Sequence, residues 1–290
     1  MPIRRPKPPK AYKNLEFLNS PEARVVRMMA EFLEPQRRLR QARVADTIVV
    51  FGSARIRPRA ETARELARTR AKYAGRARAT RSMLRELRSA ELAHELSRYY
   101  ADAVELTRLL TAWSRKLTPE NRFVVCSGGG PGIMEAANRG ASLAGGKSIG
   151  LNISLPFEQY PNRYVTPGLD FEFHYFFMRK FWFVYPAKAL IVFPGGFGTM
   201  DELMEVLTLL QTDKIKKKMA VIVYGTEYWS KVLDFQAMAD FGLISRADLD
   251  LFQFADSPEE AFTKLRDFLT REYLGRPRSG RTKKAARRRG

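Results

Sequence analysis

The stretch Ala189-Leu-Ile-Val-Phe193-Pro-Gly-Gly-Phe-Gly-Thr199-Met-Asp-Glu202 joins an apolar run to a glycine-rich loop and then to a helix-forming segment. Residues 189–193 are apolar throughout, which is typical of a strand buried on both faces of a parallel sheet. Residues 199–211 contain neither glycine nor proline and are predicted to be helical. The stretch therefore predicts a strand–loop–helix unit with a glycine-rich loop.

The same strand–loop–helix pattern recurs along the chain. Apolar strands are predicted at residues 47–51, 123–126, 147–153 and 219–224, and the first two lead into glycine-bearing loops at 52–53 and 128–132. Repeated units of this kind predict an α/β fold, a Rossmann-like doubly wound parallel sheet with helices on both faces. Ligands bind such sheets at the carboxyl ends of the strands, where these loops emerge.

The remaining segments fit a single domain over residues 14–274. Helices are predicted at 14–43, 133–143, 176–185, 228–239 and 258–272, with a short strand at 171–173. Residues 59–116 contain no proline and one glycine, which predicts two helices or one broken helix. Because that is long for a crossover between parallel strands, residues 56–90 are interpreted as a helical, arginine-rich insertion whose arginines form a solvated face.

Much of the formal net charge of +20 lies outside the predicted domain. Residues 1–13 carry five basic residues and residues 275–290 carry eight, and neither segment contains an acid. Such tails are predicted to be disordered. They would give non-specific contact with nucleic acid, or serve only as solubilising tails.

Composition excludes several other classes of protein. A hydrophobic content of 45% supplies a core, and a single cysteine, Cys126, excludes a disulfide framework. Two histidines, His94 and His174, are too few and too far apart in sequence to predict a metal site. The apolar runs are too short to cross a bilayer, so we expect a cytoplasmic protein with no membrane partner.

The loop at residues 194–198 has the chemistry of a phosphate cradle. Glycines bring backbone N–H groups close to a ligand, and the following helix directs its positive dipole end to the same place. Thr199 is expected to cap that helix or to bind the anion, with Glu202 in the first helical turn. Neither this loop nor residues 128–132 is a Walker A or Gly-x-Gly-x-x-Gly motif, so a nucleotide site is predicted without NAD or ATP chemistry. Tight turns are the alternative explanation for either loop alone.

Pro194-Gly195-Gly196-x-Gly198-Thr199-x-x-Glu202, with Gly128-Gly129-Gly130 upstream and Met178-Arg179-Lys180 between, resembles the LOG family of cytokinin riboside 5′-monophosphate phosphoribohydrolases, which are often mislabelled lysine decarboxylases. The sequence of residues 130–138, Gly-Pro-Gly-Ile-Met-Glu-Ala-Ala-Asn, resembles that of the longer bacterial branch of this family. The resemblance implies that Arg179 and Glu202 are catalytic. The predicted substrate-binding residues are Gly52, Ser53, Gly129, Gly130, Met178, Lys180, Gly195, Gly196, Phe197, Gly198, Thr199 and Thr208.

The implied reaction is hydrolysis of the N-glycosidic bond of a nucleoside 5′-monophosphate, AMP or an N6-modified AMP, as in an AMP nucleosidase. No cofactor or metal is expected, and nothing in the sequence resembles a pyridoxal-phosphate site. Glu202 would stabilise the developing oxocarbenium ion and orient water, with Arg179 as a fixed cation. Asp201 is interpreted as a cap or surface carboxylate, and Glu205 as a residue behind the site.

A homodimer or higher homo-oligomer is expected, with the aromatic residues around 175–183 forming core, an oligomer contact or a wall against the base. The alternative function is a non-catalytic nucleotide-binding or sensing protein that docks to nucleic acid through its basic tails.

Overall fold

The computed structural model describes residues 7–76, 79–155 and 160–275, and in this part of the chain seven parallel strands form one sheet. Their order across the sheet is β4-β3-β2-β1-β5-β6-β7. The strands are β1 (Asp46–Phe51), β2 (Phe123–Ser127), β3 (Ser148–Ile153), β4 (Asp170–Phe173), β5 (Ala187–Val192), β6 (Ala220–Tyr224) and β7 (Gln253–Ala255). The predicted Rossmann-like, doubly wound parallel sheet is confirmed.

The sheet is built outward from β1 in two directions. The chain passes from β1 through β2 and β3 to β4, then returns to β5, which pairs with the other side of β1. From β5 it continues outward to β7. The strand order therefore reverses between β1 and β5, and the loops that follow these two strands open a crevice at the carboxyl edge.

Two layers of helices cover the sheet, because alternate side chains of each strand face opposite sides. Val49 of β1 shares a core with helices α2, α6, α7, α8 and α9, whereas Ile48 shares one with α4, α5 and α10. The helices are α1 (Leu15–Asn19), α2 (Arg24–Gln41), α3 (Arg59–Tyr73), α4 (Arg81–Arg115), α5 (Ile133–Leu143), α6 (Phe176–Val184), α7 (Phe197–Gln211), α8 (Thr226–Val232), α9 (Phe235–Asp240) and α10 (Pro258–Leu269). A short π-helical turn, Thr270–Leu274, follows α10.

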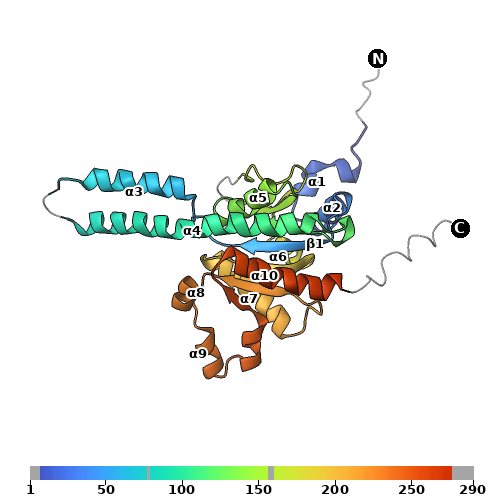
Figure 1. The fold of residues 1–290 in the computed structure, drawn as a ribbon. Helices are drawn as coiled ribbons and strands as arrows, with labels where there is room; N and C mark the ends of the chain where they lie inside the picture. The colour runs from blue at the N-terminus through green and yellow to red at the C-terminus, as the bar shows by residue number, and fades with distance from the viewer. Residues whose placement is uncertain (1–6, 77–78, 156–159, 276–290) are drawn as a thin grey trace, which may run out of the picture.

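Helices α3 and α4 form an antiparallel hairpin that projects beyond the sheet (Figure 1). Helix α4 has 35 residues and is therefore roughly 50 Å long at 1.5 Å per residue. Its carboxyl-terminal half packs against α5 and α10, and its amino-terminal half packs against α3. Thr80 caps α4, since its side chain accepts a hydrogen bond from the N–H of Met83. Residues 56–90, interpreted above as an insertion, contain α3 and only the first residues of α4, which continues into the core to Arg115.

The elements differ from the sequence predictions at four places. The helix expected over 14–43 is divided into α1 and α2, with a break at residues 20–23. Helix α7 begins at Phe197, two residues earlier than expected. The helix expected over 228–239 is divided into α8 and α9, because the side chain of Asp234 caps α9 by accepting from the N–H of Ala237. Strand β7 has three residues and was not predicted.

Most of the two basic tails lies outside the described residues, since residues 1–6 and 276–290 are not among them. Within the first tail, Ala11–Lys13 form one 3₁₀ turn. None of the helices described combines the length and the apolar character needed to span a bilayer.

Candidate active site

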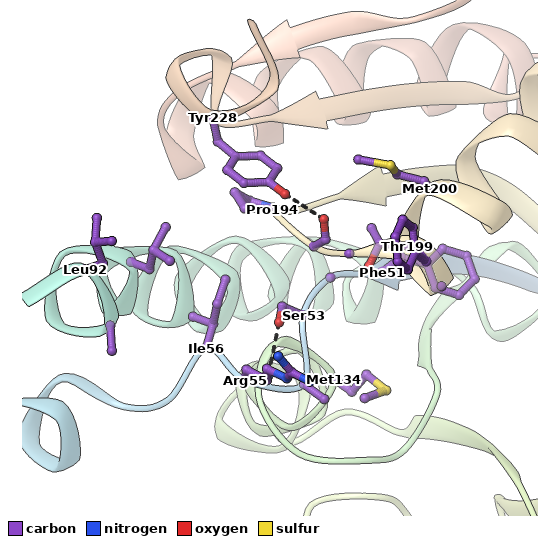
Figure 2. Close-up of a pocket in the computed structure, with 18 of the residues that line it drawn as sticks. Phe51, Ser53, Arg55, Ile56, Leu92, Met134, Pro194, Thr199, Met200 and Tyr228 are labelled. Atoms are coloured by element: carbon purple, nitrogen blue, oxygen red, sulfur yellow. Dashed lines mark hydrogen bonds between the residues drawn. The ribbon is translucent and has the colours of Figure 1, made fainter. Parts of the chain in front are cut away.

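A cavity of about 1200 Å³ opens at the crevice between the ends of β1 and β5. The loop after β5 and the start of α7 line one side, and the loop after β1 and the face of α4 line the other. Figure 2 shows Thr199 and Met200 on one side of this cavity and Ile56 and Leu92 on the other. The reversal of strand order thus places the cavity where doubly wound sheets bind ligands.

The loop at residues 194–198 curls over the start of α7 and exposes backbone to the cavity. A Cβ on Gly195 would lie 2.1 Å from Oγ1 of Thr199, so only glycine allows this close approach. The hydroxyl of Tyr228 on α8, which also lines the cavity, donates a 2.7 Å hydrogen bond to the carbonyl oxygen of Gly195 and fixes the loop (Figure 2). Phe197, the first residue of α7, is 93% exposed.

Because the first turn of a helix has N–H groups without intrahelical acceptors, the start of α7 offers donors and a positive dipole end to the cavity. Thr199 was expected as a possible cap of this helix. Gly196 occupies the N-cap position instead, without a side-chain hydrogen bond, and Thr199 lies in the first turn, where it is buried. The arrangement can hold an anion such as a phosphate group.

Glu202 lies in the second turn of α7, one turn later than expected, because the helix begins at Phe197. Its side chain lines the cavity although only 5% of the residue is exposed. Among the described residues none donates a hydrogen bond to its buried Oε2 atom. Burial raises the pKa of Glu202 to about 7, against the opposing effect of the positive charges of Lys180 and Arg179.

Arg179 lies on α6, the helix between β4 and β5, and it lines the same cavity. Its Nε donates a 2.8 Å hydrogen bond to the carbonyl oxygen of Leu151, and its guanidinium lies 5.0 Å from the ring centre of Phe183. Burial lowers the pKa of Arg179, whereas the negative charge of Glu202 raises it. An arginine stays cationic under these conditions, so the cavity holds a fixed positive charge near a titratable carboxyl group.

The glycine loop after β2 makes room for Arg179. A Cβ on Gly128 would lie 2.8 Å from Nη2 of Arg179, so a larger residue at 128 would displace the guanidinium. Gly129 and Gly130 have different neighbours: the N–H of Gly129 donates to Oγ of Ser127, and the side-chain amide of Asn162 donates to both glycine carbonyl oxygens. These bonds within the fold support the tight-turn explanation for Gly129 and Gly130.

Ser53 ties the three loops together at the crevice. Its N–H donates a 3.0 Å hydrogen bond to the carbonyl oxygen of Pro194, and its own carbonyl oxygen accepts one of 3.1 Å from the N–H of Ile133. Its Oγ accepts from the N–H of Arg55 (Figure 2). The first N–H of α5 is therefore already bonded to protein, which leaves α7 as the better anion site.

Lys180 forms ion pairs behind the cavity and does not line it. Its Nζ lies 2.8 Å from Oδ2 of Asp201 and 2.8 Å from Oε2 of Glu205, both on α7. Burial lowers the pKa of Lys180, but these two carboxylates more than offset that effect, and its pKa is raised. Asp201 is the exposed member of the group, so Lys180 joins α6 to α7 beside Glu202.

The cavity brings together nine of the fourteen predicted site residues: Gly52, Ser53, Arg179, Gly195, Gly196, Phe197, Gly198, Thr199 and Glu202. Five others do not line it: Gly129, Gly130, Met178, Lys180 and Thr208. Thr208 is exposed on α7 and its hydroxyl donates to the carbonyl oxygen of Met204. Met178 packs against the core under α6.

Sequence reasoning missed the wall that α4 supplies. Its lining residues lie on one helix face: Leu84, Arg85, Arg88, Ser89, Leu92, Ala93 and Leu96. The spacing of four between Leu84, Arg88, Leu92 and Leu96 is the available signal, but a solvated face was expected. Tyr228 was also missed, because its role depends on a contact between distant parts of the chain.

Other candidate residues lie away from this cavity. Cys126 is fully buried, and burial raises the pKa of its thiol well above the usual range. The backbone N–H of His174 donates to Glu31 of α2, and His174 does not line the cavity. Within the described ranges, no three His, Cys, Asp or Glu side chains form a group suited to a metal ion.

A family model described as "Possible lysine decarboxylase" matches residues 134–265, which include Arg179 and all of α7. A cytokinin riboside 5′-monophosphate phosphoribohydrolase of Arabidopsis thaliana is 34% identical over 86 residues, covering 29% of this chain and 40% of that protein. A protein of Oryza sativa subsp. japonica named "probable" for the same activity is 32% identical over 79 residues, covering 27% and 34%. The chain thus spans between a third and two fifths of these relatives, and the sequence resemblance predicted from the loops is confirmed.

Solved structures with similar architecture include a molybdenum cofactor binding protein from Rippkaea orientalis, with 20% identity and a TM-score of 0.44. That match covers 59% of this chain and 88% of the other. A molybdenum cofactor carrier protein from Chlamydomonas reinhardtii has 19% identity and a TM-score of 0.40, covering 60% and 89%.

Proposed function

Since this chain is a relative of the LOG family, we propose that it hydrolyses the N-glycosidic bond of a nucleoside 5′-monophosphate to give the free base and ribose 5-phosphate. The observation that carries the proposal is the placement of Glu202. It is a buried carboxyl group that lines the same cavity as the start of α7 and Arg179. Because a carboxylate can also bind ribose hydroxyl groups in a protein that only binds nucleotide, the effect of Glu202→Gln on base release separates the two functions.

The 5′-phosphate would occupy the start of α7. The donors there come from backbone that the hydrogen bond from Tyr228 holds in place, so the anion meets a preformed site. Binding energy from the phosphate, which does not react, would hold the ribose against Glu202 and help to position it for cleavage.

Cleavage of the N-glycosidic bond moves positive charge onto the ribose ring, as in glycoside hydrolysis. The ionised form of Glu202 would stabilise that charge, bind ribose hydroxyl groups and orient the attacking water. Because burial raises the pKa of this carboxyl group to about 7, the protein loses the carboxylate when the pH falls below neutrality. Arg179 would hold Glu202 in place or contact the nucleotide, and it does not act as a base.

The proposal extends to the substrate, the cofactor requirement, the location and the oligomeric state. The substrates would be AMP or an N6-modified AMP, as in a cytokinin riboside 5′-monophosphate phosphoribohydrolase. The protein would work without a cofactor, in the cytoplasm, as a homodimer or higher homo-oligomer. Any contact of its basic tails with nucleic acid would be non-specific and sensitive to salt.

The test is to incubate the purified protein with AMP, GMP, CMP, UMP and N6-isopentenyl-AMP and to measure released base by chromatography. We expect base release by the wild type and none by the Glu202→Gln variant, which retains nucleotide binding. Asp201→Asn, one residue away and exposed, is the matched control and should retain activity. Nucleotide binding without base release by the wild type would instead support the non-catalytic sensor.

A further inference from the structure

A second cavity, the amino-edge cavity, lies where β1 and β2 begin. Its volume is about 360 Å³, within the range of roughly 300–1,000 Å³ that is usual for small-molecule sites. It adjoins the carboxyl end of α4, the end away from the hairpin tip (Figure 1). Strand β1 starts beside this cavity and ends at the active-site cavity, so roughly 20 Å of strand separates the two.

Four basic residues line the amino-edge cavity: Arg43, Arg115, Arg122 and Lys147. Three of them precede neighbouring strands, because Arg43 comes just before β1, Arg122 before β2 and Lys147 before β3. Neighbouring strands lie about 4.8 Å apart, so the order β3-β2-β1 brings these three residues to one place. Arg115, the last residue of α4, completes the group.

Hydrogen bonds to backbone carbonyl oxygens hold three of these side chains at the cavity. Nζ of Lys147 donates to the carbonyl oxygen of Ala42 at 2.9 Å, and Nη1 of Arg115 donates to that of Ala144 at 2.5 Å. Nη2 of Arg122 donates to the carbonyl oxygen of Arg115 at 3.2 Å. Since a guanidinium has five N–H donors and an ammonium group three, each side chain keeps donors for a ligand.

The positive charge at this cavity exceeds what the neighbouring helices require. Helices α2, α4 and α5 all end here, and each carboxyl end is equivalent to about half a negative charge. Four cations therefore outweigh the three helix ends by more than two charges. Among the described residues, no acid lines the cavity, and Glu120 of the preceding 3₁₀ turn is not part of its wall. The cavity favours an anion with two or more negative charges.

Arg43 has a backbone conformation that favours glycine. Its φ is 56°, and it follows α2 at the position where glycine commonly ends a helix. The N–H of Val44 donates to the carbonyl oxygen of Leu39, as expected for such an ending. Helix α5 ends in the same way with Gly145, whose φ is 66°. The arginine therefore costs the fold conformational energy that glycine would not, and it adds a cation to the cavity wall.

We propose that the amino-edge cavity binds a small anion carrying two phosphate groups, and that its four cations bind the phosphate oxygens. Guanidinium groups suit this role because they bind phosphate through paired hydrogen bonds. Thr111 also lines the cavity; it is 5% exposed, and its Oγ1 has no hydrogen-bond partner among the described residues. A ligand oxygen would supply that partner. The anion is either free diphosphate or the diphosphate of a nucleotide, and its binding is independent of the proposed hydrolysis.

The test measures Kd by calorimetry at low salt with inorganic phosphate, pyrophosphate and ADP. We expect pyrophosphate to bind at least about tenfold tighter than phosphate, because it reaches more of the four cations. This preference should shrink as salt is raised, since exposed charges are screened. Phosphate groups also bind the start of α7 under the proposed function, so variants assign the affinity to one cavity or the other.

Arg43→Gly removes one cation from a position that suits glycine, so the variant should fold and bind pyrophosphate about fivefold more weakly. Adding Lys147→Gln, which keeps a donor for Ala42, should bring the loss to about twentyfold. Arg40→Ala is the matched control, because Arg40 is an exposed arginine in the last turn of α2 that does not line the cavity. Unfolding midpoints verify that all three proteins are folded.

ADP distinguishes the two sources of the diphosphate. Weaker binding of ADP by Arg43→Gly would identify a nucleotide diphosphate as a ligand of this cavity, whereas an effect on pyrophosphate alone would identify the free ion.

Four results would overturn the inference: no binding of pyrophosphate, equal affinity for phosphate and pyrophosphate, full affinity in the double variant, or equal weakening by Arg40→Ala. Pyrophosphate affinity that is lost in Gly195→Ala and kept in Arg43→Gly would also overturn it, by assigning the ion to the start of α7. The proposed hydrolysis fails separately, through the absence of base release by the wild type.

Discussion

Glu202→Gln is expected to stabilise the folded protein at pH 8 while it abolishes hydrolysis. Burial raises the pKa of this carboxyl group from 4.5 to about 7, so the folded state binds its proton more tightly than the unfolded state does. At 1.36 kcal/mol per pKa unit, ionisation of Glu202 at pH 8 costs the fold about 3 kcal/mol. Glutamine has nearly the shape of the protonated acid and does not ionise.

The free energy of unfolding depends on pH because the folded state binds the proton of Glu202 more tightly than the unfolded state does. The penalty is absent below the unfolded pKa of 4.5, grows as the pH rises, and is complete above about 7. The variant should therefore be stabilised by about 1–3 kcal/mol at pH 8, but by under about 1 kcal/mol at pH 5. The lower end of the range at pH 8 allows for imperfect hydrogen bonding of the buried amide.

Urea unfolding at pH 5 and pH 8, followed by circular dichroism, measures this difference. Asp201→Asn is the control, because Asp201 is exposed and its pair with Lys180 should contribute less than about 1 kcal/mol at either pH. A Glu202→Gln protein that is less stable than the wild type at pH 8 would refute the reasoning. Equal stabilisation at both pH values would refute it too, since the effect would not come from ionisation.

Three further outcomes can be checked on the same preparations. The kcat/KM of the wild type should fall tenfold per pH unit below about 7 and level off above it, because Glu202 acts ionised; a flat profile from pH 5.5 to 8.5 contradicts that role. Gly195→Ala should lower activity at least about 100-fold, because its Cβ would clash with Thr199. Gly196→Ala is the control, since open space surrounds Gly196 and the variant should still fold. Equal unfolding midpoints for the two variants would argue against the clash. Tyr228→Phe should raise KM about tenfold with a smaller effect on kcat, by freeing the loop that binds phosphate, and unchanged kinetics would show that this hydrogen bond is dispensable.

The sheet and the residues on one side of the cavity could be predicted from the sequence because their signals are local. Apolar runs mark β1, β2, β3, β5 and β6. The glycine loop and the helix that follows it are adjacent in sequence, so together they predict an anion site without knowledge of the rest of the fold. The start of α7 was misplaced by two residues because Thr199 is a good capping residue, whereas Gly196 caps the helix without a side chain.

The other side of the cavity depends on contacts between distant segments. The composition of the α3–α4 segment predicts helices, but not that they fold back as a hairpin and that residues of α4 such as Leu92 line the cavity. The proximity of Gly128 to Arg179 likewise joins residues 51 positions apart in the sequence. Lys180 was predicted to bind nucleotide, and the two carboxylates that hold it away from the cavity lie on another helix.

The α3–α4 hairpin separates the part of the molecule that must stay constant from a part that is free to diverge. Helix α4 is continuous from the core to the cavity wall, so the wall needs no hinge and adds no strand to the sheet. Substitution along its exposed face alters what lies across from Glu202 without disturbing the buried residues that hold the sheet together. Lengthening both arms at the tip by seven residues, about two helical turns, would leave the lining residues from Leu84 to Leu96 in place. Over evolutionary time, such a projection lets a lineage change its ligand while the sheet and the glycine loops stay under unchanged constraint.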